Sequence, residues 1–300
     1  MSTQLEILRL RLQAAEESAL RWRTEAGRLA CLSGDKTGVS GFCNHSRTLS
    51  GDAGCMPSKL AARLGRLFAN RSVLDLGAGL GLYGRYFASH SPGVRYTAVD
   101  GAEGIEEVTH GHVHFAELTD PLPTRIRDLG EPWDYVMSLE VAEHVPRALE
   151  PRLLHNLATA ATLGVVLSWA RLGQGGTAHV NCQPQAYVAC AMGHLGWQRD
   201  EVTEQWLRSA VGRHFHDCGW LRTSLLAFSR TSAPSSMLLP LPPVPTRAFM
   251  DSYLQLTSAK CPYVSDGCDT TKYKYDINRV VDPVASSRKG GDSVEGGNSV

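Results

Sequence analysis

The segment VLDLGAGLG, from Val73 to Gly81, joins a short apolar strand to a turn that holds three glycines. Gly77, Gly79 and Gly81 remove the Cβ atoms at the point where the chain must leave a sheet. Backbone amides and the N-terminus of the next helix can then close around a ligand. The alternative is a tight strand-to-helix turn that binds nothing. The coincidence of a strand, the acid Asp75 and three glycines favours the ligand-binding turn.

Short buried strands alternate with helices beyond this turn, which indicates an α/β protein. We predict a doubly wound, Rossmann-like sheet of seven strands with helices on both faces. Besides the strand before the glycine turn, we expect strands at residues 95–100, 113–118, 133–139 and 164–169, near Trp197, and at 221–229. We expect helices at residues 57–69, 82–89, 151–161 and 184–195.

Composition changes along the chain predict four regions. They are an amphipathic helix (1–32), a linker or site-covering loop (33–50), the α/β domain (51–230) and a Pro/Ser/Gly-rich tail (231–300) that we expect to be disordered. Apolar residues of the first helix recur every three or four positions, beginning with Leu5, Leu8 and Leu12. Such a seam either packs on the protein's own domain, which we favour, or supports weak self-association.

Charge and cysteine content narrow the class of protein. Thirty basic and thirty acidic residues cancel, so no overall field favours nucleic acid as a partner. The eight cysteines show no CxxC pair and no zinc-site spacing, so we expect neither a disulfide scaffold nor a structural zinc site. The N-terminus lacks the apolar stretch of a secretion signal, and no segment is long enough to span a membrane. These features predict a cytoplasmic protein.

Three segments together resemble the class I S-adenosylmethionine-dependent methyltransferases. They are VLDLGAGLG, the acid-ended strand YTAVD at 96–100, and DYVMSLEVAEHVP at 134–146. The segments SLEVAEHVP and LSWARLGQGGTAHVN also resemble an uncharacterised methyltransferase-like group within that superfamily. The resemblance covers residues 51–230 and implies S-adenosylmethionine as the cofactor and methyl transfer as the reaction.

The resemblance also implies which residues hold the cofactor. The glycine turn and Asp75 would hold the methionine end, because a carboxylate suits its positive amino group. Asp100 would accept hydrogen bonds from both ribose hydroxyls. Leu118 would line the adenine, beside Glu117, which stands where the family often has an aspartate. The full predicted set is Asp75, Gly77, Ala78, Gly79, Gly81, Asp100, Gly101, Glu117, Leu118 and Glu140.

Two alternatives from other classes stay open. Gly79, Gly81 and Gly84 spell GxGxxG, and Asp100 lies about twenty residues further on, as in NAD-dependent oxidoreductases. An acid at Asp75, beside the expected pyrophosphate, argues against that class. The other alternative is a catalytically inactive binding or scaffold protein, against which the intact glycines and acids argue.

Glu140, Glu143 and His144 form the motif ExxEH directly after the fourth predicted strand. On a helix this spacing would place both carboxylates and the imidazole on one face, at the crevice where ligands of parallel sheets bind. The trio could support the turn, supply a general base, or bind a metal, as a similar ExxEH does in some other methyltransferases. We expect no metal. Histidine has the useful pKa range, so His144 is the first candidate base, with Glu143 beside it.

His179 lies in the glycine-rich loop after the fifth predicted strand and is the second candidate base. The alternative is a loop histidine bonded to backbone, with Asn181 as the N-cap of the next helix. The neutral net charge favours a small-molecule acceptor, methylated on oxygen or nitrogen, over nucleic acid. A protein acceptor is the less favoured alternative.

Overall fold

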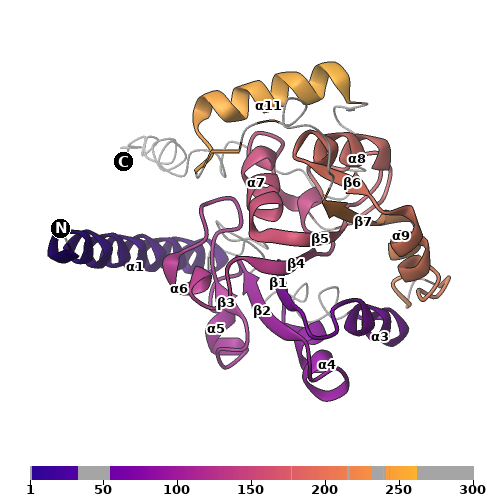
Figure 1. Cartoon of the computed structure of the whole chain (residues 1–300), viewed down its shortest axis with the longest axis horizontal. Coiled ribbons are helices and arrows are strands. Elements are labelled where there is room, and N and C mark those ends of the chain that lie inside the picture. The colour runs from indigo at the N-terminus through magenta and orange to yellow at the C-terminus, as the bar shows by residue number, and fades with distance from the viewer. Residues whose placement is uncertain are drawn as a thin grey trace, which may run out of the picture.

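The computed structural model describes residues 2–32, 55–176, 178–214, 217–230, 239, 241–242 and 244–261. Its strands are β1 (Ser72–Leu76), β2 (Arg95–Asp100), β3 (His114–Phe115), β4 (Trp133–Ser138), β5 (Ala161–Ser168), β6 (Trp197–Arg199) and β7 (Leu225–Arg230). They form one seven-stranded sheet in the order β3-β2-β1-β4-β5-β7-β6 (Figure 1). The first five strands are parallel, whereas β7 runs antiparallel to both β5 and β6. The predicted seven-stranded α/β sheet is therefore confirmed.

Helices lie on both faces of this sheet, and α1 projects from one side of the domain (Figure 1). The helices of the described residues are α1 (Ser2–Leu32), α3 (Ser58–Leu67), α4 (Leu82–His90), α5 (Ile105–Val108), α6 (Thr124–Arg127), α7 (Glu150–Ala160), α8 (Gln185–His194), α9 (Glu201–Arg208), α10 (Leu221–Ser224), α11 (Arg247–Lys260) and the 3-10 helix η1 (Ala142–His144). Successive strand residues point to opposite faces. Val73 accordingly packs in the cluster under α3, α4 and α9, and Leu74 in the cluster under α7, α8 and α11.

Several element boundaries differ from the sequence prediction. The third strand is confined to His114–Phe115, and residues 221–224 form the turn α10 before β7 begins at Leu225. Helix α9 was not predicted. It begins where the side chain of Asp200 accepts a hydrogen bond from the backbone amide of Thr203 at 3.0 Å, which satisfies an unpaired donor of the first turn.

Helix α11 lies inside the tail that the sequence predicts to be disordered, so that prediction is wrong for residues 247–260. Its buried residues Phe249, Tyr253 and Thr257 are spaced by four and form one stripe. Helix α11 lies against α7 and α8 (Figure 1). The side chain of Thr246 accepts a hydrogen bond from the amide of Phe249 at 3.1 Å and caps the helix. The folded domain thus extends past the predicted boundary at residue 230.

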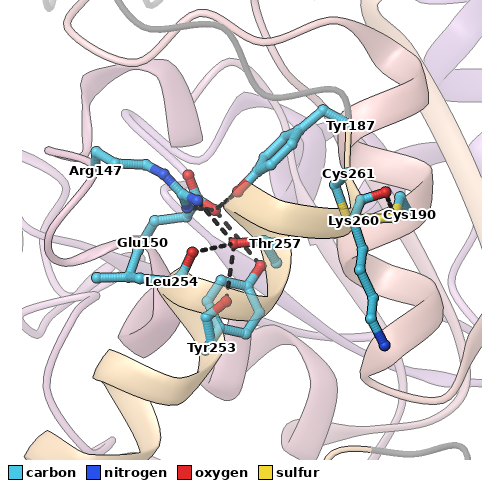
Figure 2. Close-up of a disulfide and its surroundings, with 9 residues drawn as sticks. All are labelled: Arg147, Glu150, Tyr187, Cys190, Tyr253, Leu254, Thr257, Lys260 and Cys261. Atoms are coloured by element: carbon cyan, nitrogen blue, oxygen red, sulfur yellow. Dashed lines mark hydrogen bonds and ion pairs between the residues drawn. A yellow bond between two sulfur atoms is a disulfide. The ribbon is translucent and has the colours of Figure 1, made fainter.

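A buried ion pair lies where the start of α7 meets α11 (Figure 2). The Glu150 carboxylate is fully buried and bonded to Arg147, whose guanidinium also donates to Thr257 Oγ1 at 2.8 Å. Tyr187 and Asn181 donate to the same carboxylate. Burial raises the pKa of Glu150, and these partners oppose that rise. This charged cluster therefore adds a polar contact, from Arg147 to Thr257, to the apolar packing of α11.

In the part of the chain that the structure describes, two cysteine pairs are joined as disulfides, contrary to the expectation from their spacing. Cys55 pairs with Cys218, and Cys190 pairs with Cys261, with Cα atoms 5.9 Å and 5.7 Å apart. The partners are separated by 163 and 71 residues, so the sequence contains no local signal for either bond. The second bond fixes the end of α11 to α8.

Helix α1 is confirmed, but its predicted packing on the domain is not. Leu5, Leu8, Leu12 and Leu29 are each more than half exposed. Figure 1 shows α1 projecting from one side of the domain. The Nη2 atom of Arg9 on α1 lies 3.5 Å from Oδ2 of Asp128. Among the described residues, no helix is both long enough and apolar enough to cross a lipid bilayer.

Because Leu8 and Leu12 are exposed, we expect the double variant Leu8→Glu with Leu12→Glu to keep the free energy of unfolding within about 0.5 kcal/mol of the wild type. Urea denaturation followed by circular dichroism measures this difference. A loss above about 2 kcal/mol, the size expected for buried leucine, would show that the helix packs on the domain after all.

Candidate functional site

The candidate site lies at the edge of the sheet where the parallel strands end. The strand order reverses between the neighbouring strands β1 and β4. From β1 the chain continues to β2 and β3 on one side of the sheet, whereas from β4 it continues to β5 on the other side. In an open parallel sheet, the crevice at such a reversal is where ligands bind. The glycine turn follows β1, Asp100 is the last residue of β2, and the ExxEH segment follows β4, so all three lie at this edge.

The glycine turn adopts a conformation that residues with side chains rarely accept. Gly77, Gly79 and Gly81 have φ angles of +88°, +54° and +70°. The amides of Gly77 and Ala78 donate to the carbonyl of Val99 at 2.8 and 3.0 Å, which fixes the turn to the end of β2. A Cβ on Gly77 would lie 2.3 Å from Val141 Cγ2, so the turn also packs closely against the segment after β4.

Asp100 connects this turn to the next loop. Its Oδ2 accepts a hydrogen bond from the amide of Gly79 at 2.7 Å, and its Oδ1 accepts one from Ala102 at 2.8 Å. Burial raises the pKa of Asp100, and the hydrogen bonds from the glycine turn and the following residues, Gly101 included, oppose that rise. Each carboxylate oxygen has two lone pairs, so both can accept one more hydrogen bond.

Asp75 lies in the interior, two residues before the turn. Its side chain is 3% exposed and accepts a hydrogen bond from the Tyr96 hydroxyl. Burial raises the pKa of the Asp75 carboxyl to about 7, with a smaller contribution from Asp100 in the same direction. Gly84 leaves room for the Tyr96 ring, because a Cβ there would lie 2.3 Å from the ring.

Glu117 and Leu118 follow β3 at the same edge. The Glu117 Oε1 accepts hydrogen bonds from the amide and the hydroxyl of Thr119, at 3.0 and 2.8 Å. The carbonyl of Leu118 accepts one from the Asn156 side chain at 2.8 Å, and the Leu118 side chain is 7% exposed. This segment is therefore held in place by α7.

The ExxEH residues do not share one helical face, because Glu140 precedes the 3-10 helix and has a φ of +56°. Its carboxylate accepts hydrogen bonds from Gln174 and Ser224, both at 2.9 Å, and its amide donates to Ser168 Oγ at 2.7 Å. Glu140 thus joins the ends of β4 and β5 to the following loop. No motif in the sequence marks these three partners.

The structure brings Glu143, His144 and His179 together. One potential ligand atom of each lies within 4.8 Å of the others, and the two imidazole rings meet edge to face at 4.9 Å. Burial, followed by the charge of Glu140, raises the pKa of Glu143 well above its ordinary value. Burial and His179 lower the pKa of His144 to about 3. The cluster has the ligand types of a metal site or of a proton-transfer group.

The loop after β5 positions His179. The amides of Val180 and Asn181 donate to the carbonyl of Glu143 at 2.8 and 3.0 Å, and His179 Nδ1 lies 3.2 Å from the carbonyl of Gln174. Asn181 is not the predicted N-cap, because Pro184 precedes α8 and the Asn181 side chain donates to Glu150 at 2.8 Å. The buried cluster under α11 therefore supports this loop.

A comparison with protein families finds a match over residues 52–170 to a model described as a methyltransferase domain. The sheet has the corresponding Rossmann-like arrangement, with an antiparallel β7 inserted between β5 and β6. Residues 52–170 are therefore similar to a methyltransferase domain. The matched residues contain the glycine turn, Asp100 and the whole ExxEH segment, whereas His179 follows them.

Solved structures resemble the methyltransferase domain at low identity. The Synechocystis magnesium protoporphyrin IX methyltransferase with bound SAH is 16% identical over 58% of this chain and 83% of that chain, with a TM-score of 0.41. The Burkholderia thailandensis 1,6-didemethyltoxoflavin-N1-methyltransferase is 16% identical over 73% and 90%, with a TM-score of 0.45. No curated protein sequence matches the chain. The family match and the sheet order therefore carry the assignment.

Proposed function

We propose that this chain transfers a methyl group from S-adenosylmethionine to an oxygen or nitrogen atom of a small molecule. The observation that carries the proposal is the position of the glycine turn. It lies where the order of the sheet reverses, and Asp100 ends the neighbouring strand beside it. This arrangement supports a nucleoside ligand at the carboxyl edge.

The residues present fit such a ligand. Asp100 is a two-oxygen acceptor whose remaining lone pairs suit the two hydroxyls of a ribose. The positive φ angles of Gly77, Gly79 and Gly81 keep side chains out of the turn, so that backbone groups can approach a ligand. Glu117 and Leu118 follow β3 at the same edge, where we assign them to the adenine.

The methionine end of the cofactor would lie at the turn. We assign Ala78 and Gly101 to the backbone around the cofactor and Glu140 to the wall between cofactor and acceptor. Asp75 already bonds to Tyr96, so we infer that it does not bind the positive amino group directly and that, once ionised by the nearby positive charge, it attracts that group through its own charge.

When bound, S-adenosylmethionine supplies an electrophilic methyl group on a positively charged sulfur. The protein mainly has to align the acceptor atom with that methyl group and exclude water. An alcohol or a protonated amine must also lose a proton, and Glu143, His144 and His179 are our candidates for receiving it. Burial lowers the pKa of His144 to about 3 and also lowers the pKa of His179, so both imidazoles are neutral at pH 7 and neither is favoured over the other as the base.

Calorimetric titration with S-adenosylmethionine, S-adenosylhomocysteine and NADH tests the proposal. We expect micromolar binding of the first two and none of NADH. Binding of NADH alone would support the oxidoreductase. Binding of none of the three would favour a scaffold protein.

The variant Asp100→Ala tests the ribose assignment. We expect it to weaken binding of S-adenosylmethionine by about 1 to 3 kcal/mol, because hydrogen bonds to a charged acceptor are lost. Asp134→Ala is the matched control, since Asp134 lies at the start of β4 and accepts from the amide of Ser72 at 2.8 Å, on the opposite edge. Equal dissociation constants for the wild type and Asp100→Ala would refute this role.

A further inference from the structure

A second group of metal-ligand side chains lies away from the candidate site, between α8 and α11. Cys190, His194 and Cys261 each place one potential ligand atom within 4.8 Å of the others. Figure 2 shows the two cysteines joined where the end of α11 meets α8. We infer that, when its two thiols are reduced, this cluster binds a zinc ion.

The helices hold these side chains on facing surfaces. Cys190 and His194 are four residues apart in the last turns of α8, so they lie on the same face of that helix. Cys261 follows α11 directly, and its amide donates to the carbonyl of Thr257 at 2.9 Å. The packing of α11 through Phe249 and Tyr253 keeps Cys261 beside α8, independently of the disulfide.

The ligand set suits zinc more than the common alternatives. Two thiolates and one imidazole are the soft and borderline ligands that zinc prefers, whereas magnesium and calcium prefer oxygen. In a tetrahedral zinc site, ligand atoms lie about 3.3 to 3.8 Å apart, as the metal–ligand lengths require. The Cα atoms of the two cysteines are 5.7 Å apart, so rotation of the side chains can provide this separation. Cys190 and His194 are only partly buried, which leaves a path for the ion and a water as fourth ligand.

The disulfide and the zinc-bound thiolates exclude one another, because both use the same two sulfur atoms. A dithiol reductant donates two electrons and two protons to the disulfide, giving two thiols and an oxidised reductant. Zinc then binds with release of both thiol protons, because thiolates are the ligands. A reducing compartment would hold the thiol form. In either state one link joins α8 to α11. This inference does not depend on the proposed methyl transfer.

Titration with cobalt(II), a spectroscopic substitute for zinc, tests the inference on the full chain. Reduced wild-type protein should bind one equivalent and show thiolate-to-cobalt charge-transfer absorption, and zinc should displace the cobalt. The oxidised protein should show no such band. Cys190→Ser and His194→Ala should each weaken binding at least about tenfold in the reduced protein.

Two further variants decide where the ion binds. Cys55→Ser removes a cysteine of the other disulfide, which has no histidine ligand beside it among the described residues, and should bind cobalt like the wild type. His179→Ala disrupts the cluster of Glu143, His144 and His179 and should also leave the charge-transfer band unchanged. Loss of the band in either variant, or its persistence in His194→Ala at full affinity, would overturn the inference.

A second readout covers variants that fold poorly. Zinc should raise the melting temperature of the reduced wild type, because the ion binds the folded chain preferentially. It should not raise that of the oxidised wild type, whose thiols are consumed in the disulfide. An equal rise in both forms would place the ion elsewhere and overturn the inference.

Discussion

The variant Arg147→Ala is expected to lower the free energy of unfolding by about 3 to 5 kcal/mol, because it leaves a buried carboxylate without its cation. Glu150 is fully buried, and Arg147 is the cation paired with it in the part of the chain that the structure describes. Arg147 also bonds to Thr257, so the variant weakens the contact of α11 as well. Urea denaturation at pH 7 measures the loss.

The matched control is Arg152→Ala in the first turn of α7, which follows Arg147. The Nη1 atom of Arg152 lies 3.3 Å from Oδ1 of Asp120. Both side chains are one-third exposed, so water screens the attraction between these two charges. Its loss should cost less than about 1 kcal/mol. The double variant Arg147→Met with Glu150→Gln should recover much of the stability, since it removes the buried charge together with its partner. Equal losses for the two arginine variants would contradict the assigned importance of the buried pair.

Asp75→Asn is expected to change how stability depends on pH. The folded pKa of Asp75 is about 7, raised by burial from an ordinary value of 3.8. Between these values the folded chain holds a proton that the unfolded chain has lost, so the free energy of unfolding falls as pH rises. At 1.36 kcal/mol per pKa unit, the contribution amounts to roughly 4 kcal/mol between pH 4 and pH 8.

Because an asparagine side chain carries no charge at any of these pH values, the Asp75→Asn variant should gain stability relative to the wild type as pH rises from 4 to 8. Urea denaturation of the ligand-free protein at several pH values measures the difference, which separates Asp75 from the other buried acids. Tyr96→Phe removes the hydrogen bond that opposes the pKa rise and should extend the dependence to higher pH. A constant difference between wild type and Asp75→Asn across this range would contradict a protonated Asp75.

The position of the candidate site could be predicted because it depends on local signals. The run VLDLGAGLG gives a strand and a glycine turn, and in parallel strands everything after a carboxyl end lies at one edge. For that reason the sequence alone places Asp100, Glu117 and Glu140 at the same edge of the sheet. The predicted roles of these residues remain predictions.

The geometry inside the site could not be predicted in the same way. The ExxEH spacing suggested one helical face, but the left-handed backbone at Glu140 sends its carboxylate to Gln174 and Ser224. The meeting of His179 with Glu143 depends on hydrogen bonds from the loop after β5. Such contacts join residues that are far apart in sequence, so spacing does not reveal them.

Helices α1 and α11 also show which features the sequence could predict and which it could not. An apolar seam predicted α1 correctly but could not say that Leu8 stays exposed. The Pro/Ser/Gly-rich composition of the tail predicted disorder where α11 forms. The stripe of Phe249, Tyr253 and Thr257 in α11 is short and has polar neighbours, so it gives a weak helix pattern. Helix formation there is stabilised by packing on α7 and α8, and such packing is absent from any local pattern.

By itself, the sequence determined the α/β class, the seven strands and the edge that carries the glycine turn, because strand and turn formation depend on neighbouring residues. Only the tertiary structure decided the pairing of Cys190 with Cys261, the burial of the Arg147–Glu150 pair and the position of His179 beside Glu143 and His144. The physical reason is that burial and charge pairing depend on groups that the folded chain brings together from distant positions in the sequence. The pKa values of buried acids and the strengths of ion pairs depend on those neighbouring groups.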